Sequence, residues 1–270
     1  MNYQELIKPL EIIIKDAGDI LLTYFNKNNL ERFDKPDGSF ATQADLESEK
    51  FLIAKLHELV PEAGFFTEET GIKNGNNEYL WVIDPLDGTT NFAQGLPYFC
   101  ISIALTKNNI PVVGVVYNPL LQEFFYALKG AGAFLITPIT QTTHQKVNIN
   151  HQTLNLNNHK SLKNSVILFS VPYKKNMHFF DEITSIAHQA YSVRTLGAAA
   201  LDQAYVAAGR GDAVVMQGLS WWDVAAGMLL ITEAGGIVTD FKGEEITPKY
   251  QTFLGGISPL YDELRVLVKT

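Results

Sequence analysis

One segment, YLWVIDPLDGTTNFAQG (Tyr79 to Gly95), places an apolar run directly before two aspartates that stand three positions apart. The run YLWVI has the composition of a buried strand. A carboxylate at the end of such a strand is costly unless it is paired or bound to a metal ion. The glycine and two threonines that follow predict a turn with free backbone N–H groups. The chain must therefore fold so that a rigid strand directs two acids at one place.

Composition and charge narrow the possible classes of protein. The chain has 270 residues, enough for one large domain or two packed halves, with 46% hydrophobic and 19% charged residues. It shows no N-terminal signal and no apolar run that could span a bilayer, and its single cysteine, Cys100, excludes an internal disulfide and suits a reducing cytosol. A net charge of −8 argues against nucleic acid as a general partner. We therefore expect a cytoplasmic protein that binds neither membranes nor nucleic acid in general.

Hydrophobic periodicity predicts mixed α and β structure. Apolar spacings of three and four predict a helix over 3–26, with Pro9 near its first turn, and a second helix over 43–60, ended by Pro61. Between them, DKPDGSFAT (34–42) has the composition of a polar loop. Strand-like runs follow at 79–83, 98–106, 112–118 and 123–128, and PLLQ joins the last two in a hairpin pattern.

The polar segment 138–165, rich in Asn, Gln and Thr, is interpreted as the join between two halves, 1–145 and 146–270. Beyond it the pattern predicts a strand at 166–171, a short strand at 212–216 and a closing pair of strands. Helices are predicted at about 177–190, from near Gly197 and from about Val224. No internal repeat is visible.

Several familiar chemistries are missing from the sequence. It contains no G-x-S-x-G elbow and no Walker phosphate loop. The segment GAGAF (130–134) lacks the third glycine and the helix context of a dinucleotide-binding loop, and it is interpreted as a tight turn between strands. The six histidines show no metal-ligand spacing, so each is interpreted as structural or solvated.

A set of carboxylates in unusual settings is the remaining chemical signal. Asp84 and Asp87 follow the apolar strand, Glu68 and Glu69 follow AGFF in a turn, and Asp223 opens the helix VAAGMLLITEAGG. Ligation by oxygen alone indicates a hard cation, Mg²⁺ before Ca²⁺ or Mn²⁺. Taken singly, Asp223 could be a helix N-cap, Asp84 a turn residue, and the two glutamates a solvated pair. Taken together, these acids favour a metal site.

Two longer motifs carry a resemblance to a known family. DPLDGTTNF (84–92) resembles the first signature of the inositol monophosphatase family, and WDVAAGMLLITEAGG (222–236) resembles its second. Further similar segments are TEE (67–69), DGSFATQADLESE (37–49), VVYNPLLQEFFYALKGAGAF (115–134) and RTLGAAALDQAYVAAGRGD (194–212). The resemblance covers nearly the whole chain, is weakest over 138–190, and is greatest to the bacterial inositol-monophosphatase-type branch.

The resemblance implies a set of metal ligands. Glu68, Asp84 and the backbone carbonyl of Leu86 would hold a first Mg²⁺, and Asp84, Asp87 and Asp223 would hold a second. Asp84 would bridge the pair. A third, looser ion in the family depends on the glutamate that matches Glu68, largely through water, so two to three ions are expected, with Mn²⁺ a possible substitute.

The resemblance also implies catalytic and phosphate-binding roles. Asp45 and Thr89 match residues that orient the attacking water, with Glu68 as the third catalytic residue, and Gly88 and Thr89 would offer backbone N–H groups to the phosphate. The implied activity is a Mg²⁺-dependent, lithium-sensitive phosphomonoesterase, which hydrolyses a small sugar or polyol phosphate, such as inositol monophosphate, by direct attack of metal-activated water. Cations held by carboxylates would let an acidic protein bind a dianion.

The substrate is less determined by the sequence. In the family the alcohol portion lies against the segment matching Gly197, Ala198 and Ala199, and against a glutamate whose position here is Met216. A thioether is a poor hydrogen-bond acceptor, so Met216 argues against a strict preference for inositol phosphates. The alternative is that Met216 simply packs inward at the end of a strand. A 3′(2′),5′-bisphosphate nucleotidase and a fructose bisphosphate phosphatase are the alternatives within the family.

The implied fold is the layered α-β-α-β-α arrangement of the fructose-1,6-bisphosphatase-like sugar phosphatases. The N-terminal half would supply most metal ligands, the C-terminal half would supply Asp223 and the substrate wall, and the site would lie at their junction. We expect the loop 34–42 to order over the metals, and the family implies a homodimer. A non-enzymatic alternative is a regulatory or binding protein that uses the phosphatase scaffold.

Overall fold

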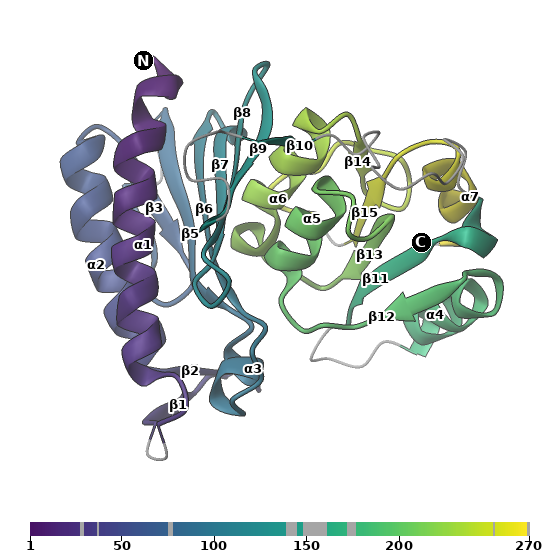
Figure 1. Cartoon of the computed structure of the whole chain (residues 1–270), viewed down its shortest axis with the longest axis horizontal. Helices are drawn as coiled ribbons and strands as arrows, with labels where there is room; N and C mark the ends of the chain where they lie inside the picture. The colour runs from purple at the N-terminus through teal and green to yellow at the C-terminus, as the bar shows by residue number, and fades with distance from the viewer. Residues whose placement is uncertain are drawn as a thin grey trace.

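Helices and sheets alternate through the molecule in the layer order α-β-α-β-α, from left to right in Figure 1. The computed structural model describes residues 1–27, 30–36, 38–74, 78–138, 145–147, 161–171, 177–250 and 252–268. An eight-stranded sheet lies between an outer and an inner pair of helices, and a five-stranded sheet lies between that inner pair and a second outer pair. The layered sugar-phosphatase fold predicted from the sequence is confirmed.

The eight-stranded sheet has the order β10-β9-β8-β7-β6-β5-β3-β4 and is antiparallel except between β3 and β5. Its strands are β3 (Gly64–Thr67), β4 (Gly71–Lys73), β5 (Tyr79–Asp87), β6 (Cys100–Lys107), β7 (Ile110–Asn118), β8 (Glu123–Leu128), β9 (Gly132–Ile136) and β10 (Gln145–Val147). Trp81 and Ile83 of β5 belong to the apolar cluster of the outer helices, whereas Val82 belongs to that of the inner helices. Burial on both faces explains the continuous apolar run YLWVI.

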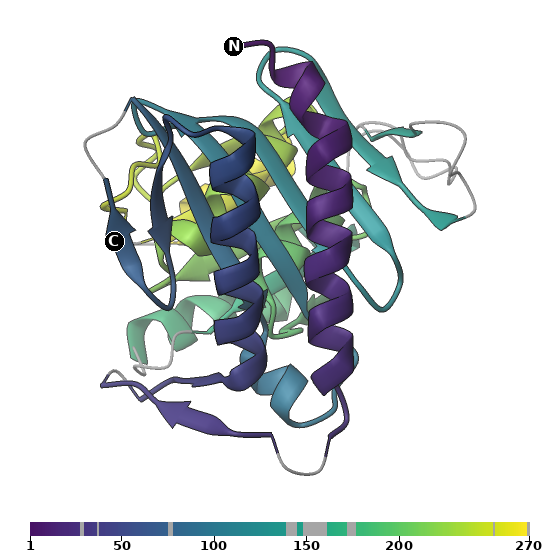
Figure 2. The ribbon, with the colours of Figure 1, turned by 90° about the vertical axis from the view of Figure 1, so that its left-hand side faces the viewer.

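The outer helices of this sheet are α1 (Ile7–Tyr24), preceded by the 3₁₀ turn η1 (Tyr3–Leu6), and α2 (Gln43–Leu59). Figure 2 shows them side by side across the sheet. Before α2, the strands β1 (Arg32–Asp34) and β2 (Phe40–Thr42) form a separate antiparallel hairpin. A capping box begins α2, in which Thr42 and Asp45 exchange hydrogen bonds with each other's backbone N–H groups.

The inner layer consists of α5 (Ala199–Ala207) and α6 (Trp221–Glu233), which contact both sheets. The inner layer can lie close to the eight-stranded sheet because small residues of the sheet face it. A Cβ at Gly114 of β7 would lie 2.8 Å from the backbone oxygen of Ala226, so only glycine lets α6 lie directly on this strand. The short helix α3 (Thr89–Ala93) follows β5 at one end of the layer.

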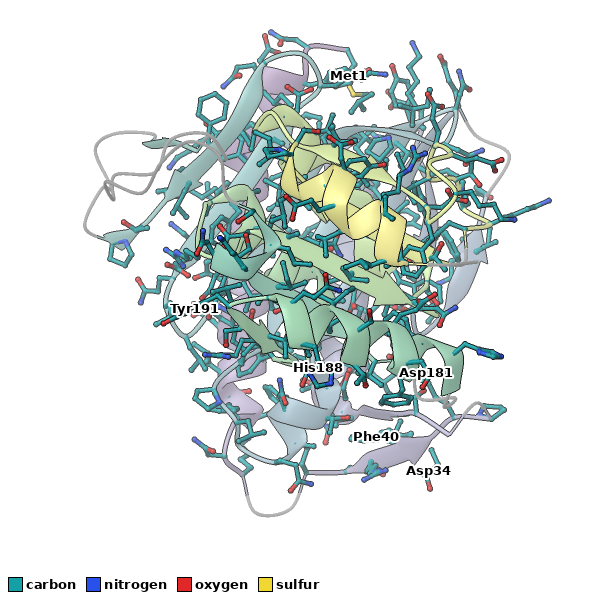
Figure 3. The ribbon with its side chains drawn as sticks, turned by 90° about the vertical axis from the view of Figure 1, so that its right-hand side faces the viewer. Met1, Asp34, Phe40, Asp181, His188 and Tyr191 are labelled. Carbon is teal, nitrogen blue, oxygen red and sulfur yellow. The ribbon has the colours of Figure 1, made fainter. Side chains whose placement is uncertain are left out.

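The five-stranded sheet has the order β12-β11-β13-β15-β14. Its strands are β11 (Val166–Ser170), β12 (Ser192–Arg194), β13 (Ala213–Gln217), β14 (Ile237–Thr239) and β15 (Thr252–Gly256). The first three run parallel to one another, and β15 is antiparallel to both of its neighbours. The outer face is covered by α4 (Met177–Gln189) and α7 (Leu260–Leu267), seen from outside in Figure 3. A 3₁₀ turn, η3 (Leu162–Asn164), precedes β11.

Most of the predicted elements are confirmed, including both N-terminal helices and the hairpin of β7 and β8, where Asn118 pairs with Glu123. The turn predicted at 130–134 is confirmed only in part, because the connection between β8 and β9 ends at Ala131 and residues 132–134 belong to β9. The interpretation of 34–42 as a loop is wrong at its ends, because Asp34 and Phe40 pair as strand residues. The helix α7 was not predicted.

Most of the join predicted at 138–165 lies outside the described residues, and the division into halves at 145/146 stays a prediction. Among the described residues, no helix has the length and apolar character needed to span a bilayer.

Candidate metal centre and phosphate site

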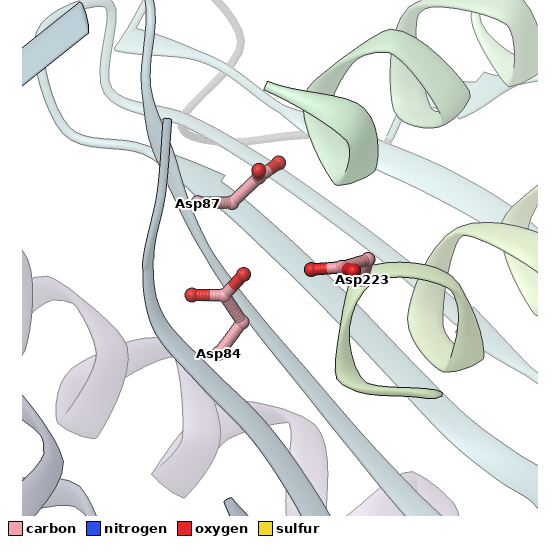
Figure 4. Close-up of side chains that lie close together, drawn as sticks. All are labelled: Asp84, Asp87 and Asp223. Atoms are coloured by element: carbon pink, nitrogen blue, oxygen red, sulfur yellow. The ribbon is translucent and has the colours of Figure 1, made fainter. Parts of the chain in front are cut away.

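The end of β5 places two aspartates on the same side of the chain. Successive side chains of a regular strand alternate between faces, so residues three apart would point in opposite directions. The pairing of β5 with β6 shifts register between Asp84 and Asp87, and this irregularity at Pro85 and Leu86 removes the conflict. Figure 4 shows both side chains leaving the strand on the same side, with Asp223 of α6 beside them. The Pro-Leu step is therefore what lets one strand supply two neighbouring acids.

The third acid comes from α6. Asp223 is the third residue of this helix and forms a capping box with Ser220, whose backbone N–H donates to Asp223 Oδ2 over 2.6 Å. One carboxylate oxygen from each of Asp84, Asp87 and Asp223 lies within 4.8 Å of the others (Figure 4). Such a set of close, oxygen-only donors suits a hard divalent cation such as Mg²⁺. The cluster fits the metal that the sequence predicts.

The pKa values of the three aspartates are raised, which means that their ionised forms are costly when no cation is bound. Burial, then the charges of Glu68, Asp87 and Asp223, raise the pKa of Asp84 well above its usual range. Burial and the charges of Asp87 and Glu68 raise the pKa of Asp223 in the same way. Burial raises the pKa of Asp87 to about 6, against the opposing effect of donated hydrogen bonds. A divalent ion would supply the charge that stabilises all three carboxylates in their ionised forms.

The start of α5 holds Asp87 in place. The backbone N–H groups of Ala199 and Ala200 donate to Asp87 Oδ1 and Oδ2 over 3.1 and 2.7 Å. The buried thiol of Cys100 lies 3.6 Å from Asp87 Oδ2. The segment predicted as a substrate wall thus has a second role, because Ala199 lines the cleft and also orients a candidate metal ligand. Ala198 is buried in the core.

Thr89 and Asp45 contact each other. Thr89 Oγ1 lies 3.0 Å from Asp45 Oδ1 and 3.0 Å from the carbonyl oxygen of Leu86. Asp45 is fully buried and accepts hydrogen bonds from the backbone N–H and hydroxyl of Thr42. Burial raises the pKa of Asp45 to about 6, although the bonds from Thr42 oppose the rise. Thr89 lines the cleft beside the aspartate cluster, and Asp45 is its buried partner.

Glycines shape the backbone around Thr89. Gly88 has a φ of +92° as the N-cap of α3, and a Cβ there would lie 3.1 Å from the carbonyl oxygen of Tyr98. Gly197 has a φ of +87°, and a Cβ there would lie 2.9 Å from Asn91 Nδ2. That amide donates to the carbonyls of Tyr98 and Leu196 over 2.8 and 2.7 Å. Asn91 therefore ties α3 to the segment before α5, and glycine is needed on both sides.

Glu68 lines the same cleft but is engaged by a lysine that sequence reasoning missed. Lys35 Nζ lies 2.7 Å from Glu68 Oε1 and 2.7 Å from Glu69 Oε1. Although burial opposes its charge, the two glutamates raise the pKa of Lys35 above its usual value. Burial and the charge of Glu68 raise the pKa of Glu69 to about 7. Lys35 is in the turn between β1 and β2, within the segment expected to lie over the metals.

The cleft has a volume of about 420 Å³, and its lining includes Glu68, Asp84, Leu86, Asp87, Gly88, Thr89, Gly197, Ala199 and Asp223. Its other wall comes from the ends of β11 and β13 and the segment before α5, including Ser170, Val171, Leu196 and Leu219. Met216 is not part of this lining. Its side chain is fully buried in the core, with Sδ 3.7 Å from Gln203 Nε2. Of the two interpretations of Met216, the inward-packed one describes its place in the structure.

The three histidines that the structure describes are not part of the acid cluster. His57, His178 and His188 are exposed, and Figure 3 shows His188 on the outer helix α4. His144, His151 and His159 lie outside the described residues. The sequence reasoning also missed Glu49, whose carboxylate accepts hydrogen bonds from the backbone N–H groups of Glu69 and Thr70, next to Glu68. Glu49 had a readable signal, since it follows Asp45 by four positions and so shares its helical face. Lys35 had none, because a lysine in a polar turn is an ordinary residue.

Known proteins resemble this chain over most of its length. The model of the inositol monophosphatase family matches residues 2–267. A protein of Xylella fastidiosa named Nus factor SuhB is 39% identical over 235 residues, which cover 86% of this chain and 80% of that protein. An inositol-1-monophosphatase of Mesorhizobium japonicum is 38% identical over 244 residues, which cover 89% of this chain and 84% of that protein.

Solved structures give the same result. The extragenic suppressor protein suhB from Bartonella henselae superposes with a TM-score of 0.89 at 31% identity, covering 98% of this chain and 99% of that one. An IMPase from Thermotoga maritima gives 0.83 at 30% identity, covering 99% of this chain and 96% of that one. The signatures, the layered fold and these matches converge, and the chain belongs to the inositol monophosphatase family.

Proposed function

We propose that this protein is a Mg²⁺-dependent phosphomonoesterase that hydrolyses a small sugar or polyol phosphate by direct attack of water. The observation that carries the proposal is the aspartate cluster, with oxygens within 4.8 Å of one another, beside the Thr89–Asp45 pair in one cleft. Phosphate ester hydrolysis needs positioning and charge neutralisation more than covalent chemistry from the protein. The cleft contains the groups for both.

The ligands are assigned as the resemblance implies. Glu68, Asp84 and the Leu86 carbonyl would hold one ion, and Asp84, Asp87 and Asp223 another, with a third, looser ion near Glu68. Bound Mg²⁺ would neutralise phosphate charge, lower the pKa of a water molecule and stabilise the leaving oxygen. Equilibrium dialysis with Mg²⁺ or Mn²⁺ would test the number of ions, and binding of fewer than two would contradict this assignment.

The protein's own groups would do the remaining work. Thr89 Oγ1, held by Asp45 and the Leu86 carbonyl, would fix the position of the attacking water, and the backbone N–H groups of Gly88 and Thr89 would contact the phosphate. A single displacement inverts the configuration at phosphorus. Hydrolysis of a substrate with a chiral, isotopically labelled phosphate should therefore proceed with inversion, whereas retention would indicate a phospho-enzyme and contradict direct attack.

The residues that line the wall of the cleft suit a substrate with a small alcohol portion. Ser170, Val171, Leu196 and Leu219 offer hydroxyl and apolar groups around the space beyond the phosphate site. We therefore place inositol-type polyol monophosphates and sugar monophosphates ahead of fructose bisphosphate and 3′(2′),5′-bisphosphate nucleotides. A Mg²⁺-dependent assay over a panel of these esters would rank them. Higher kcat/KM for a bisphosphate nucleotide than for every polyol phosphate would make the nucleotidase alternative the better one.

A second candidate function comes from the relatives' names. The Xylella fastidiosa protein is named Nus factor SuhB, which favours a regulatory binding role carried by the same scaffold. The two functions can be separated with Asp87→Asn, which removes a candidate metal ligand while preserving side-chain shape. This variant should lose phosphatase activity. Any complex with the transcription machinery that survives the substitution would be independent of catalysis.

The remaining parts of the proposal follow the family. We propose a homodimer in the cytoplasm, inhibited by lithium through competition at the metal centre. Light scattering of the purified chain would test the dimer, and a mass of one chain at micromolar concentration would contradict it. Absence of inhibition by millimolar Li⁺ at limiting Mg²⁺ would contradict the lithium proposal.

A further inference from the structure

One face of α2 carries three polar side chains where apolar ones would be expected. Asp45, Ser48 and Glu49 follow one another at spacings of three and one, so they lie on the same helical face as the apolar Leu52 and Leu56. Asp45 and Ser48 are fully buried and Glu49 is 1% exposed. Burying such groups costs free energy unless each one is hydrogen-bonded. Their partners therefore indicate why the helix retains them.

Each of the three contacts a different segment of the metal centre. Asp45 accepts from the hydroxyl of Thr89, after the first signature's aspartates. The hydroxyl of Ser48 donates to the carbonyl of Pro85, between Asp84 and Leu86, over 3.1 Å. The helix thus touches the turn at the end of β5 at two points.

Glu49 contacts the turn between β3 and β4, which carries Glu68. Its Oε2 accepts from the backbone N–H of Glu69 over 2.8 Å, and its Oε1 accepts from that of Thr70 over 2.9 Å. The N–H of the preceding residue, Glu68, donates to the carbonyl of Ile83 in β5 over 3.2 Å. The turn that carries Glu68 is therefore held by β5 on one side and by a bidentate carboxylate on the other.

We infer that Glu49 is a positioning residue for the metal centre, which fixes the turn after β3 so that Glu68 faces Asp84. This inference rests on the proposed function only for the presence of a metal ion, not for the substrate or the reaction. A carboxylate has two acceptor oxygens and can bind two N–H groups at once, whereas the amide of Gln has one acceptor and one donor. The glutamate is matched to this turn in a way that its isosteric amide is not.

The test is direct binding of Mn²⁺, measured without substrate by the loss of the free-ion signal in electron paramagnetic resonance. Glu49→Gln should weaken Mn²⁺ binding about tenfold, the size typical of groups that orient metal ligands. Glu47→Gln, which makes the same charge change on the exposed face of α2, should stay within about twofold of the unsubstituted protein. Equal binding by Glu49→Gln and Glu47→Gln would overturn the inference.

Two further measurements separate positioning from general stability. In a Glu68→Gln background, Glu49→Gln should change Mn²⁺ binding less than twofold, because its effect passes through Glu68. An undiminished tenfold loss there would overturn the inference. In the unsubstituted protein without metal, the amides of Glu69 and Thr70 should already resist hydrogen exchange, and exchange at the rate of an open turn would overturn it too. If the unsubstituted protein does not bind Mn²⁺ at all, the metal centre itself is refuted. If it binds Mn²⁺ but has no phosphatase activity, only the proposed reaction is refuted.

Discussion

The two walls of the cleft are built in different ways. On the side of the acid cluster, the four aspartates accept backbone hydrogen bonds: Asp84 from Leu86, Asp87 from α5, Asp223 from Ser220 and Asp45 from Thr42. On the opposite side, Ser170, Val171 and Leu219 stand at strand ends or in short connections and are partly or fully exposed to the cleft. The first wall lies within the core, and the second lies at its margin.

We expect the first wall to determine the reaction and the second wall to determine the choice of substrate. Groups fixed by the backbone of two sheets and three helices cannot move without disturbing the core, so the chemistry of the first wall is stable to sequence change elsewhere. Side chains at strand ends can change without that penalty. We expect the predictions below to give large effects on the first wall and small, substrate-dependent effects on the second.

The largest expected effect comes from Asp84→Asn. This change removes the acid at the centre of the cluster, and the loss of several kcal/mol of charge stabilisation corresponds to a fall in kcat/KM of roughly a thousandfold or more. Because the change also relieves repulsion among buried acids, the thermal midpoint without Mg²⁺ should rise. Asp16→Asn on the exposed face of α1 is the control. A variant with near-normal activity would show that Asp84 is not a ligand.

The next effect concerns the hydroxyl of Thr89. Thr89→Val keeps the shape of the side chain and removes the group that contacts Asp45 and the Leu86 carbonyl. We expect kcat to fall about a hundredfold, the scale of a lost group in proton transfer, with little change in KM. Thr89→Ser restores the hydroxyl and should recover most of kcat. A fall in Thr89→Ser as large as that in Thr89→Val would show that the hydroxyl is not the active feature.

Stability should depend on Mg²⁺ and on pH together. The pKa of Asp87 and that of Asp45 are raised to about 6 in the folded chain from an ordinary 3.8, so the folded state binds more protons than the unfolded state between these values. Without Mg²⁺, stability should therefore fall as pH rises from about 4 to 6. It should go on falling at higher pH, because the pKa of Glu69 is raised to about 7 and those of Asp84 and Asp223 are raised well above their usual range. Mg²⁺ at 100 times its dissociation constant adds about 2.7 kcal/mol.

The measurement is the thermal midpoint at pH 5 and pH 7.5, with and without Mg²⁺. Mg²⁺ should raise the midpoint by roughly 5–10 °C at pH 7.5 and by less at pH 5, because protons then compete for the same carboxylates. In Asp84→Asn, the increase at pH 7.5 should be much reduced. An equal increase at both values of pH would indicate that the ion binds elsewhere.

The smallest expected effect lies on the second wall. Leu219 is partly exposed and lines the cleft, so Leu219→Ala should alter KM roughly fivefold for substrates that reach it. The value of kcat for a small generic ester should stay within about twofold. A loss of kcat as large as that of Thr89→Val would mean that the two walls are not separable.

The fold could be predicted from the sequence where burial is continuous. The run YLWVI is short and rich in β-branched and aromatic residues, which favours a strand, and residues 43–60 have the apolar spacing of a helix. The helix α7 was missed, although Leu260, Leu264 and Leu267 keep the three- and four-residue spacings of a helix. Residues 34–42 resemble a loop because their turn residues are strong signals. The strands β1 and β2 have only three residues each, the first exposed throughout and the second buried throughout, so neither shows an alternating pattern.

The site could be predicted from its motifs but not from residue chemistry alone. Asp84, Asp87 and Asp223 stood out because acids beside apolar runs are costly, and the structure brings these three together. Lys35 could not be found, since its pairing with Glu68 depends on how a separate hairpin meets the sheet. Met216 could not be placed either, because the inward or outward direction of a strand's last residues depends on its register.

The two capping boxes have a consequence for how relatives of this chain can be compared. Asp45 and Asp223 each stand third in their helix and accept the backbone N–H that precedes it, so each starts a helix as well as serving the cleft. A descendant that no longer hydrolysed anything would still be selected to retain both, simply to fold. Persistence of these two acids in a sequence is therefore weak evidence of an active enzyme. Asp84 and Thr89, which start no helix by a side-chain cap, are the positions at which a lapsed activity would first leave a mark.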